Sequence, residues 1–116
     1  MSTVSKTAEQ LIYEAASDIG AIGPGEVLSA EDYAKFDSKL DSLLEELNES
    51  YSIYIADKND IPNPYFLTLA RLLGNVAGSA VVAAPMNDAA WQRDIQSLKR
   101  MAAARPSYAT LKTSYY

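Results

Sequence analysis

The side chains able to do chemistry in this chain are carboxylates, lysines and tyrosines, because its 116 residues include no cysteine and no histidine. Without these two residue types the chain lacks thiolate nucleophiles, disulfides, and the commonest general base and metal ligand. Acidic pairs such as Glu45 and Glu46 fall on a helix face with no pocket implied, which gives glycosidase chemistry no support. We therefore predict that the protein is not an enzyme and has no catalytic, metal-binding or cofactor-binding residues.

Three glycines and a run of turn-forming residues do not match known ligand-binding loops. Gly20, Gly23 and Gly25 have the wrong spacing for a dinucleotide-binding loop and do not follow a strand, so they predict a turn. The segment 57–60 lacks the ligand spacing and the distal glutamate of a calcium-binding loop. No DNA-reading motif is present either. Binding to another protein is therefore the favoured class of function.

Charge is distributed unevenly along the chain. Residues 1–60 hold four lysines and thirteen acidic residues, a net charge of −9, whereas residues 61–116 hold six basic and two acidic residues, a net charge of +4. Two interpretations stay open: ordinary solvated helix faces, or surfaces that meet oppositely charged partners or each other in a closed ring. The residues concerned are Asp37, Asp41, Glu45 and Glu49 on one helix and Arg93, Lys99 and Arg100 on another.

Four predicted helices position these residues, so the predicted fold class is all-α, a four-helix bundle. The first helix begins near Thr7, where Gln10 completes a capping box, and stops at Gly20. The second begins after Ser29, and six large apolar residues recur along it at helical spacing. They are Tyr33, Phe36, Leu40, Leu43, Leu44 and Leu47.

The third helix is predicted to be central. Two prolines begin it, and residues 65–84 are apolar nearly all round before Pro85 ends it. Arg71 within this segment makes a membrane span costly, so we predict no membrane partner. Gly74 and Gly78 share a face on which another helix can approach closely.

Residues 51–60 link the second and third helices. Tyr51 to Ile55 alternates and is rich in β-forming residues, which predicts a short strand or an extended arm. The turn-rich residues 57–60 would allow it to close a small hairpin. A lone strand would otherwise need a partner to satisfy its backbone.

The fourth helix is capped by Asn87, carries Trp91, Ile95 and Leu98 on its inner face, and ends at Arg105–Pro106. Residues 1–105 are thus predicted as one helical domain, with residues 106–116 as an extended C-terminal tail. The tail is either a disordered terminus or a segment that orders on a partner. In the second case six residues would anchor it, since tyrosine is favoured at interfaces. They are Arg105, Pro106, Tyr108, Leu111, Tyr115 and Tyr116.

The order of the elements resembles that of a known family. A helix over residues 7–20 leads into a glycine-rich loop, and a leucine-striped helix containing Leu40 and Leu47 follows. Then come an extended segment, the sequence Ile61-Pro-Asn-Pro-Tyr65, and a last helix with Leu98-Lys99-Arg100. Over residues 5–105 this pattern resembles the head-to-tail adaptor proteins of tailed bacteriophages, also called connector or head-completion proteins, including their tail accessory factors.

The resemblance implies a virion structural protein at the head-to-tail junction, present in the host cytoplasm during assembly. Family members are helical bundles that form a homo-oligomeric ring, usually of about twelve subunits, under the portal protein. The ring extends the channel through which packaged DNA passes without specific binding, and it docks the next tail component, a tail or stopper protein.

The resemblance also assigns roles to residues of this chain. The tail anchors named above would contact the portal or a neighbouring subunit. Tyr51, Ile53, Tyr54 and Ile55 would contact the next tail component. The two charged helix faces would lie between subunits or face the channel. The alternative function is that of a small cytoplasmic helical protein-binding regulator, similar to an antitoxin module. For both functions we expect intracellular synthesis, because the first seven residues lack the apolar core of a signal peptide.

Overall fold

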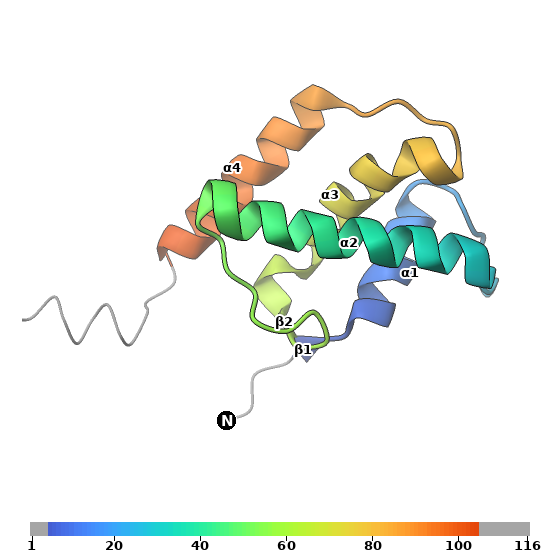
Figure 1. The fold of residues 1–116 in the computed structure, drawn as a ribbon, viewed down its shortest axis with the longest axis horizontal. Helices are drawn as coiled ribbons and strands as arrows, with labels where there is room; N and C mark the ends of the chain where they lie inside the picture. The colour runs from blue at the N-terminus through green and yellow to red at the C-terminus, as the bar shows by residue number, and fades with distance from the viewer. Residues whose placement is uncertain (1–4, 105–116) are drawn as a thin grey trace, which may run out of the picture.

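The computed structural model describes residues 5–104 as a helical bundle with a minimal two-stranded sheet (Figure 1). The all-α prediction is confirmed. The third helix is central: the other three helices all pack against it, with α1 and α4 on opposite flanks and α2 crossing over it. The elements are β1 (Ser5–Lys6), α1 (Ala8–Asp18), α2 (Ala30–Tyr51), β2 (Ile61–Pro62), α3 (Asn63–Val81) and α4 (Asp88–Ala104).

Side-chain caps fix where three of the helices begin. Thr7 Oγ1 accepts a hydrogen bond from the Gln10 backbone N–H at 3.2 Å, and Gln10 Oε1 accepts one from the Thr7 N–H at 2.9 Å. Ser29 and Asn87 each accept a backbone N–H bond from the residue three positions later, at 3.1 and 3.0 Å. Each bond satisfies a backbone donor that the first helical turn would leave unpaired. The three predicted caps are confirmed.

The core follows the apolar stripes read from the sequence. Phe36, Leu40, Leu43 and Leu47 of α2 are buried, while Tyr33 and Leu44 lie half-buried at the edge of the stripe. From α3 the buried large side chains are Tyr65, Phe66, Leu69, Leu72 and Leu73. From α4 they are Trp91, Ile95 and Leu98. Removal of this apolar surface from water is the main force that holds the bundle together.

The third helix ends earlier than the sequence predicts. It stops at Val81, four residues before Pro85, because Ala83 adopts a left-handed backbone conformation with φ of +58°. The N–H groups of Val82 and Ala84 both bond to the carbonyl oxygen of Gly78, at 2.9 and 3.2 Å. The backbone is therefore satisfied by this turn, and the proline lies in the connection to α4.

Residues 51–60 form an irregular arm and no hairpin. Tyr51 belongs to α2, and Ser52 ends the helix with φ of +58°. The Ile53 N–H then bonds to the Leu47 carbonyl oxygen at 3.0 Å. The strand lies just after the arm, at Ile61–Pro62, where it pairs antiparallel with Ser5–Lys6. The alternation read as a strand thus marks side chains that turn into and out of the core.

At Gly74 the end of α1 packs closely against α3. A Cβ atom at this position would lie 2.9 Å from Ile19 Cγ2 and 3.4 Å from the Ala15 carbonyl oxygen. A Cβ at Gly78 would lie 3.6 Å from Ala84, which is an ordinary contact distance. The predicted close approach is therefore made at Gly74, while Gly78 faces the loop after α3.

The two glycines should respond oppositely to alanine. We expect Gly78→Ala to raise the free energy of unfolding by about 0.5–1 kcal/mol, because alanine favours the helix. Gly74→Ala should be less stable than Gly78→Ala by about 1–3 kcal/mol, because Ile19 has to move. Urea unfolding of both variants measures this difference; equal stabilities would mean that α1 and α3 are not in close contact at Gly74.

Candidate functional site

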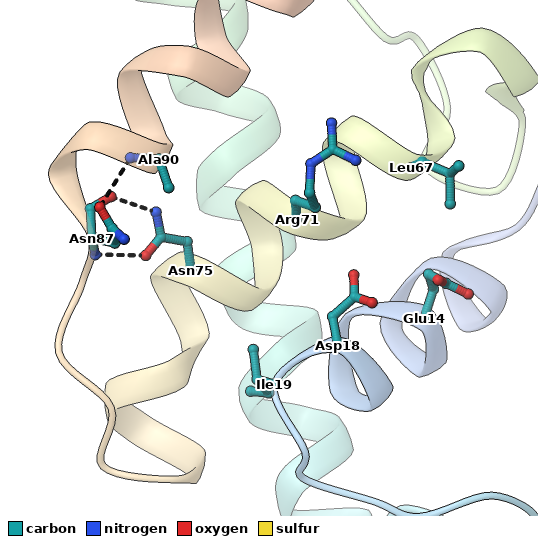
Figure 2. Close-up of a pocket in the computed structure, with 8 residues that line it drawn as sticks. All are labelled: Glu14, Asp18, Ile19, Leu67, Arg71, Asn75, Asn87 and Ala90. Atoms are coloured by element: carbon teal, nitrogen blue, oxygen red, sulfur yellow. Dashed lines mark hydrogen bonds between the residues drawn. The ribbon is translucent and has the colours of Figure 1, made fainter.

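The central helix has one side that no other helix covers. Val76 of this helix faces α2 and lies near Leu43. The exposed stripe is on the opposite side of the helix from Val76. Between α1 and α4 this stripe forms the floor of an open groove of about 520 Å³ (Figure 2). The lining residues are Glu14, Asp18 and Ile19 from α1 and its end, Leu67, Arg71 and Asn75 from α3, and Asn87 and Ala90 from the start of α4.

Helical spacing places these residues together. Leu67, Arg71 and Asn75 are four residues apart, so they share one face of α3. Glu14 and Asp18 have the same spacing and form the α1 wall. Leu67 has 57% of its surface exposed, which is unusual for a leucine on a central helix. The groove thus has an acidic wall and a floor that combines apolar Leu67 with polar Arg71 and Asn75.

Arg71 and Asp94 form the ion pair that joins α3 to α4 beside this groove. Asp94 is only 1% exposed, and its Oδ1 lies 3.2 Å from Arg71 Nε and 3.5 Å from Arg93 Nε. Arg71 Nη2 also donates to Thr68 Oγ1 at 3.2 Å. Since a buried carboxylate needs a cation, Asp94 explains why the otherwise apolar α3 contains an arginine. The pair also leaves the charge of Arg71 largely balanced within the chain.

Two asparagines close one end of the groove. The Asn75 side-chain Nδ2 donates to the Asn87 carbonyl oxygen at 2.9 Å, and the Asn87 N–H donates to Asn75 Oδ1 at 2.8 Å. The Asn87 side chain caps α4 through the Ala90 N–H (Figure 2). These bonds hold the first turn of α4 against α3, so the groove has a defined width at this end.

A second hollow lies on the same α3–α4 seam, toward the C-terminal end of α4. It has a volume of about 440 Å³ and is lined by Thr68, Ser97, Arg100 and Met101. Arg100 Nη2 donates to Ser97 Oγ at 3.3 Å along its edge. Thr68, the partner of Arg71, lines this second hollow and not the first.

The predicted acidic row of α2 divides into two parts. Lys58 Nζ from the arm lies 2.9 Å from Asp37 Oδ1 and 3.0 Å from Asp41 Oδ1, so these two carboxylates are neutralised within the chain. Glu45 and Glu49 are exposed, and the described part of the chain offers no cation within ion-pair distance of either. Only the C-terminal half of the row is therefore available to a partner as unpaired charge.

Lys58 holds the arm against α2. Hydrogen bonds to Asp37 and then to Asp41 raise the pKa of its ammonium group above its usual 10.5. The neighbouring Asn59 Oδ1 accepts the Ala8 N–H at 3.2 Å, which links the arm to the start of α1. The arm is thereby fixed at two points.

We expect Lys58→Met to lower the free energy of unfolding by about 0.5–1 kcal/mol, because two partly exposed ion pairs are lost. The pKa of the Lys58 ammonium group is higher in the folded protein than in the unfolded chain, where it is near 10.5. The stabilisation by Lys58 is therefore fully present below pH 10.5 and is lost as the pH rises through the pKa of the folded state. Thermal melts at pH 7 and above pH 11 measure it, with the exposed Lys39→Met as the control. If both variants behave alike at pH 7, the Lys58 pairs do not stabilise the fold.

The predicted contact residues of the arm do not share one surface. Ile53 is 2% exposed and belongs to the core, so its assignment to a partner contact is wrong in this conformation. Tyr51 and Ile55 are half-buried against the core. Tyr54 is 70% exposed and remains available to a partner. The apolar character of the segment thus reflects mainly its packing against the bundle.

The predicted basic residues of α4 are exposed. Arg93 has 66% of its side chain exposed despite its proximity to Asp94, and Lys99 and Arg100 are exposed as well. The tail anchors from Arg105 to Tyr116 lie outside the described residues.

Glu14, Asp18 and Leu67 line the groove but were not predicted as site residues. The four-residue spacing of Leu67 with Arg71 and Asn75 is the sequence signal that indicates a half-exposed face on α3.

Within residues 5–104, no three acidic side chains lie close enough together to hold a metal ion, and no helix is long and apolar enough to cross a membrane. Comparison of the chain with protein-family models, with curated proteins and with solved structures found no match. The functional interpretation therefore depends on the surfaces described above and on the resemblance in element order.

Proposed function

We propose that the protein is a head-to-tail adaptor of a tailed bacteriophage, a virion structural protein that joins the portal to the next tail component. The observation that carries the proposal is the order of the elements: a capped helix, a glycine-rich loop, an acidic helix, an arm, a proline-started apolar helix and a basic helix. The helical bundle formed by residues 5–104 is the fold that the resemblance implies.

The charge distribution supports this proposal. The outward faces of α2 and α4 carry unpaired charges of opposite sign, Glu45 and Glu49 on one and Lys99 and Arg100 on the other. Oppositely charged surfaces on one protomer suit a polar assembly, in which different faces meet neighbouring copies, the portal or the next tail component. In this proposal the ring, of about twelve subunits, extends the portal channel, and packaged DNA passes through it without specific binding.

The partners in this proposal are the portal, a tail or stopper protein, and further copies of the chain. Arg105, Pro106 and the tyrosines at 108, 115 and 116, together with Leu111, would anchor the protein on the portal or a neighbouring subunit. Exposed Tyr54 is the arm residue best placed to contact the next tail component. No membrane is involved in this proposal, and the protein would pass from the host cytoplasm into the virion during assembly.

Truncation after Arg105 tests the assignment of the tail. We expect the truncated protein to fold like the full-length protein, because the core lies within the described residues. Its affinity for candidate portal rings should fall at least tenfold, or by about 1.4 kcal/mol. Circular dichroism checks the fold and surface plasmon resonance measures the affinity. Unchanged portal affinity would show that the tail is not the anchor.

Native mass spectrometry distinguishes the proposal from the alternative of a small protein-binding regulator. The adaptor is expected to form larger assemblies with the portal ring. A stable dimer, or an equimolar complex with one small partner, that never joins portal rings would favour the regulator.

A further inference from the structure

The groove on α3 is a helix face left without a partner. Its floor carries Leu67, and its α1 wall carries Glu14 and Asp18. Neither acid has a cation within ion-pair distance among the described residues. The only basic side chain on the floor, Arg71, is paired with buried Asp94. The groove therefore offers a negative wall and a mixed floor, with exposed Leu67 beside Asn75 and the paired Arg71, to whatever covers it.

The outer face of α4 has the complementary character. Trp91, Ile95 and Leu98 direct one side of this helix into the core. Arg93 and Arg100 project from the opposite side, seven residues or about 10.5 Å apart along the helix axis. The outer face between and beside them carries Gln96 and small alanines, so another surface can approach it closely. We call this surface the basic stripe of α4.

Among the described residues, no ion pair joins the acidic wall to the basic stripe within one chain. Helix α4 forms the other side of the groove through Ala90, and its Arg93 and Arg100 stay exposed, Arg93 beside buried Asp94 and Arg100 at the second hollow. A second copy of the chain can bring its basic stripe to the open groove. In such a pair, one copy keeps a free basic stripe and the other copy keeps a free groove.

We propose that the basic stripe of α4 of a second copy occupies the groove, with Arg93 and Arg100 facing Glu14 and Asp18. This contact rests on the proposed function only in that a ring requires some contact between unlike faces of neighbouring copies. Because the two surfaces differ, the contact is heterologous and propagates around a ring. Charge complementarity favours this occupant over nucleic acid, whose phosphates the acidic wall repels.

Disulfide trapping tests the contact directly, because the natural chain contains no cysteine. We expect the full-length double variant Asp18→Cys/Arg100→Cys, oxidised in the presence of portal rings, to give a ladder of linked multimers on a non-reducing gel. The matched control Glu49→Cys/Arg100→Cys places the first cysteine on the acidic face of α2 instead. A ladder from the control and not from the first variant would overturn the proposal, as would equal yields from both.

Charge reversal provides the second test. Glu14→Lys/Asp18→Lys removes the acidic wall, and Arg93→Gln/Arg100→Glu removes the basic stripe without placing a new acid beside Asp94. We expect each variant alone to lose about tenfold or more in multimer yield, because like charges then oppose each other. Mixed together they should assemble again, since the native wall of one variant meets the native stripe of the other, and the reversed wall meets the reversed stripe at the next contact.

Glu45→Lys/Glu49→Lys makes the same change of charge on α2 and should leave assembly intact. Normal assembly of both charge-reversed variants would overturn the proposed contact. If portal complexes still form in that case, the adaptor function stands and only the assigned surface fails. If multimers form through this contact but never bind portal, the contact stands and the adaptor function fails.

Discussion

Replacing Phe36 by alanine should lower the free energy of unfolding by about 4 kcal/mol, the largest effect expected of any single change considered for this chain. Phe36 is completely buried on α2, which packs across the central helix. Its removal loses the transfer free energy of the ring and leaves a cavity that the surrounding side chains fill only in part. A domain of this size has about 5–15 kcal/mol of total stability, so the variant should be only marginally folded.

Two controls separate cavity formation from a general loss of apolar surface. Phe36→Leu should cost less than half as much as Phe36→Ala, since most of the volume is retained. Leu67→Ala should change stability by less than about 1 kcal/mol, because Leu67 is 57% exposed in the groove. Chemical denaturation of the three variants measures these differences. A cost for Leu67→Ala as large as that for Phe36→Ala would mean that the groove is closed in the folded protein.

Replacing Arg71 by methionine should lower the free energy of unfolding by about 3 kcal/mol, because it leaves the Asp94 carboxylate buried without its main cation. Arg93 lies 3.5 Å from the same oxygen and should offset a small part of this loss. Asp94→Leu alone should cost less than Arg71→Met, since the freed arginine side chain is 46% exposed and can be hydrated.

The double variant Arg71→Met/Asp94→Leu completes the cycle. It should be more stable than Arg71→Met by about 2 kcal/mol, because no buried charge then remains unpaired in the α3–α4 interface and the exposed Arg93 can be hydrated. Urea denaturation of the four proteins gives the coupling free energy. Strictly additive effects would show that the two residues do not interact in the folded state.

The helices were predictable because their signals are local. Thr7 with Gln10, Ser29 and Asn87 each satisfy backbone donors within their own first turn, and the spacing of Phe36, Leu40 and Leu47 is that of one helix face. The end of α3 was not predictable from Pro85, because the left-handed conformation of Ala83 depends on how the chain turns back toward α4. The strand pairing of Lys6 with Ile61 joins segments far apart in sequence, which no local pattern indicates.

The candidate surfaces were predictable only in part. Exposed acidic and basic residues on α2 and α4 followed from helical spacing, but the pairing of Asp37 and Asp41 with Lys58 depends on the path of the arm. Ile53 was misjudged because apolar residues after a helix can serve either an interface or the core. The groove required knowledge of which side of α3 the other helices leave open, and that is set by the packing of all four.

Electron microscopy of portal rings mixed with the full-length protein tests whether this chain is an adaptor. We expect an added ring of density on the tail-facing side of the portal, with the same rotational symmetry around the channel. Portal rings that look unchanged at saturating protein concentration would contradict the assignment of this chain as a head-to-tail adaptor.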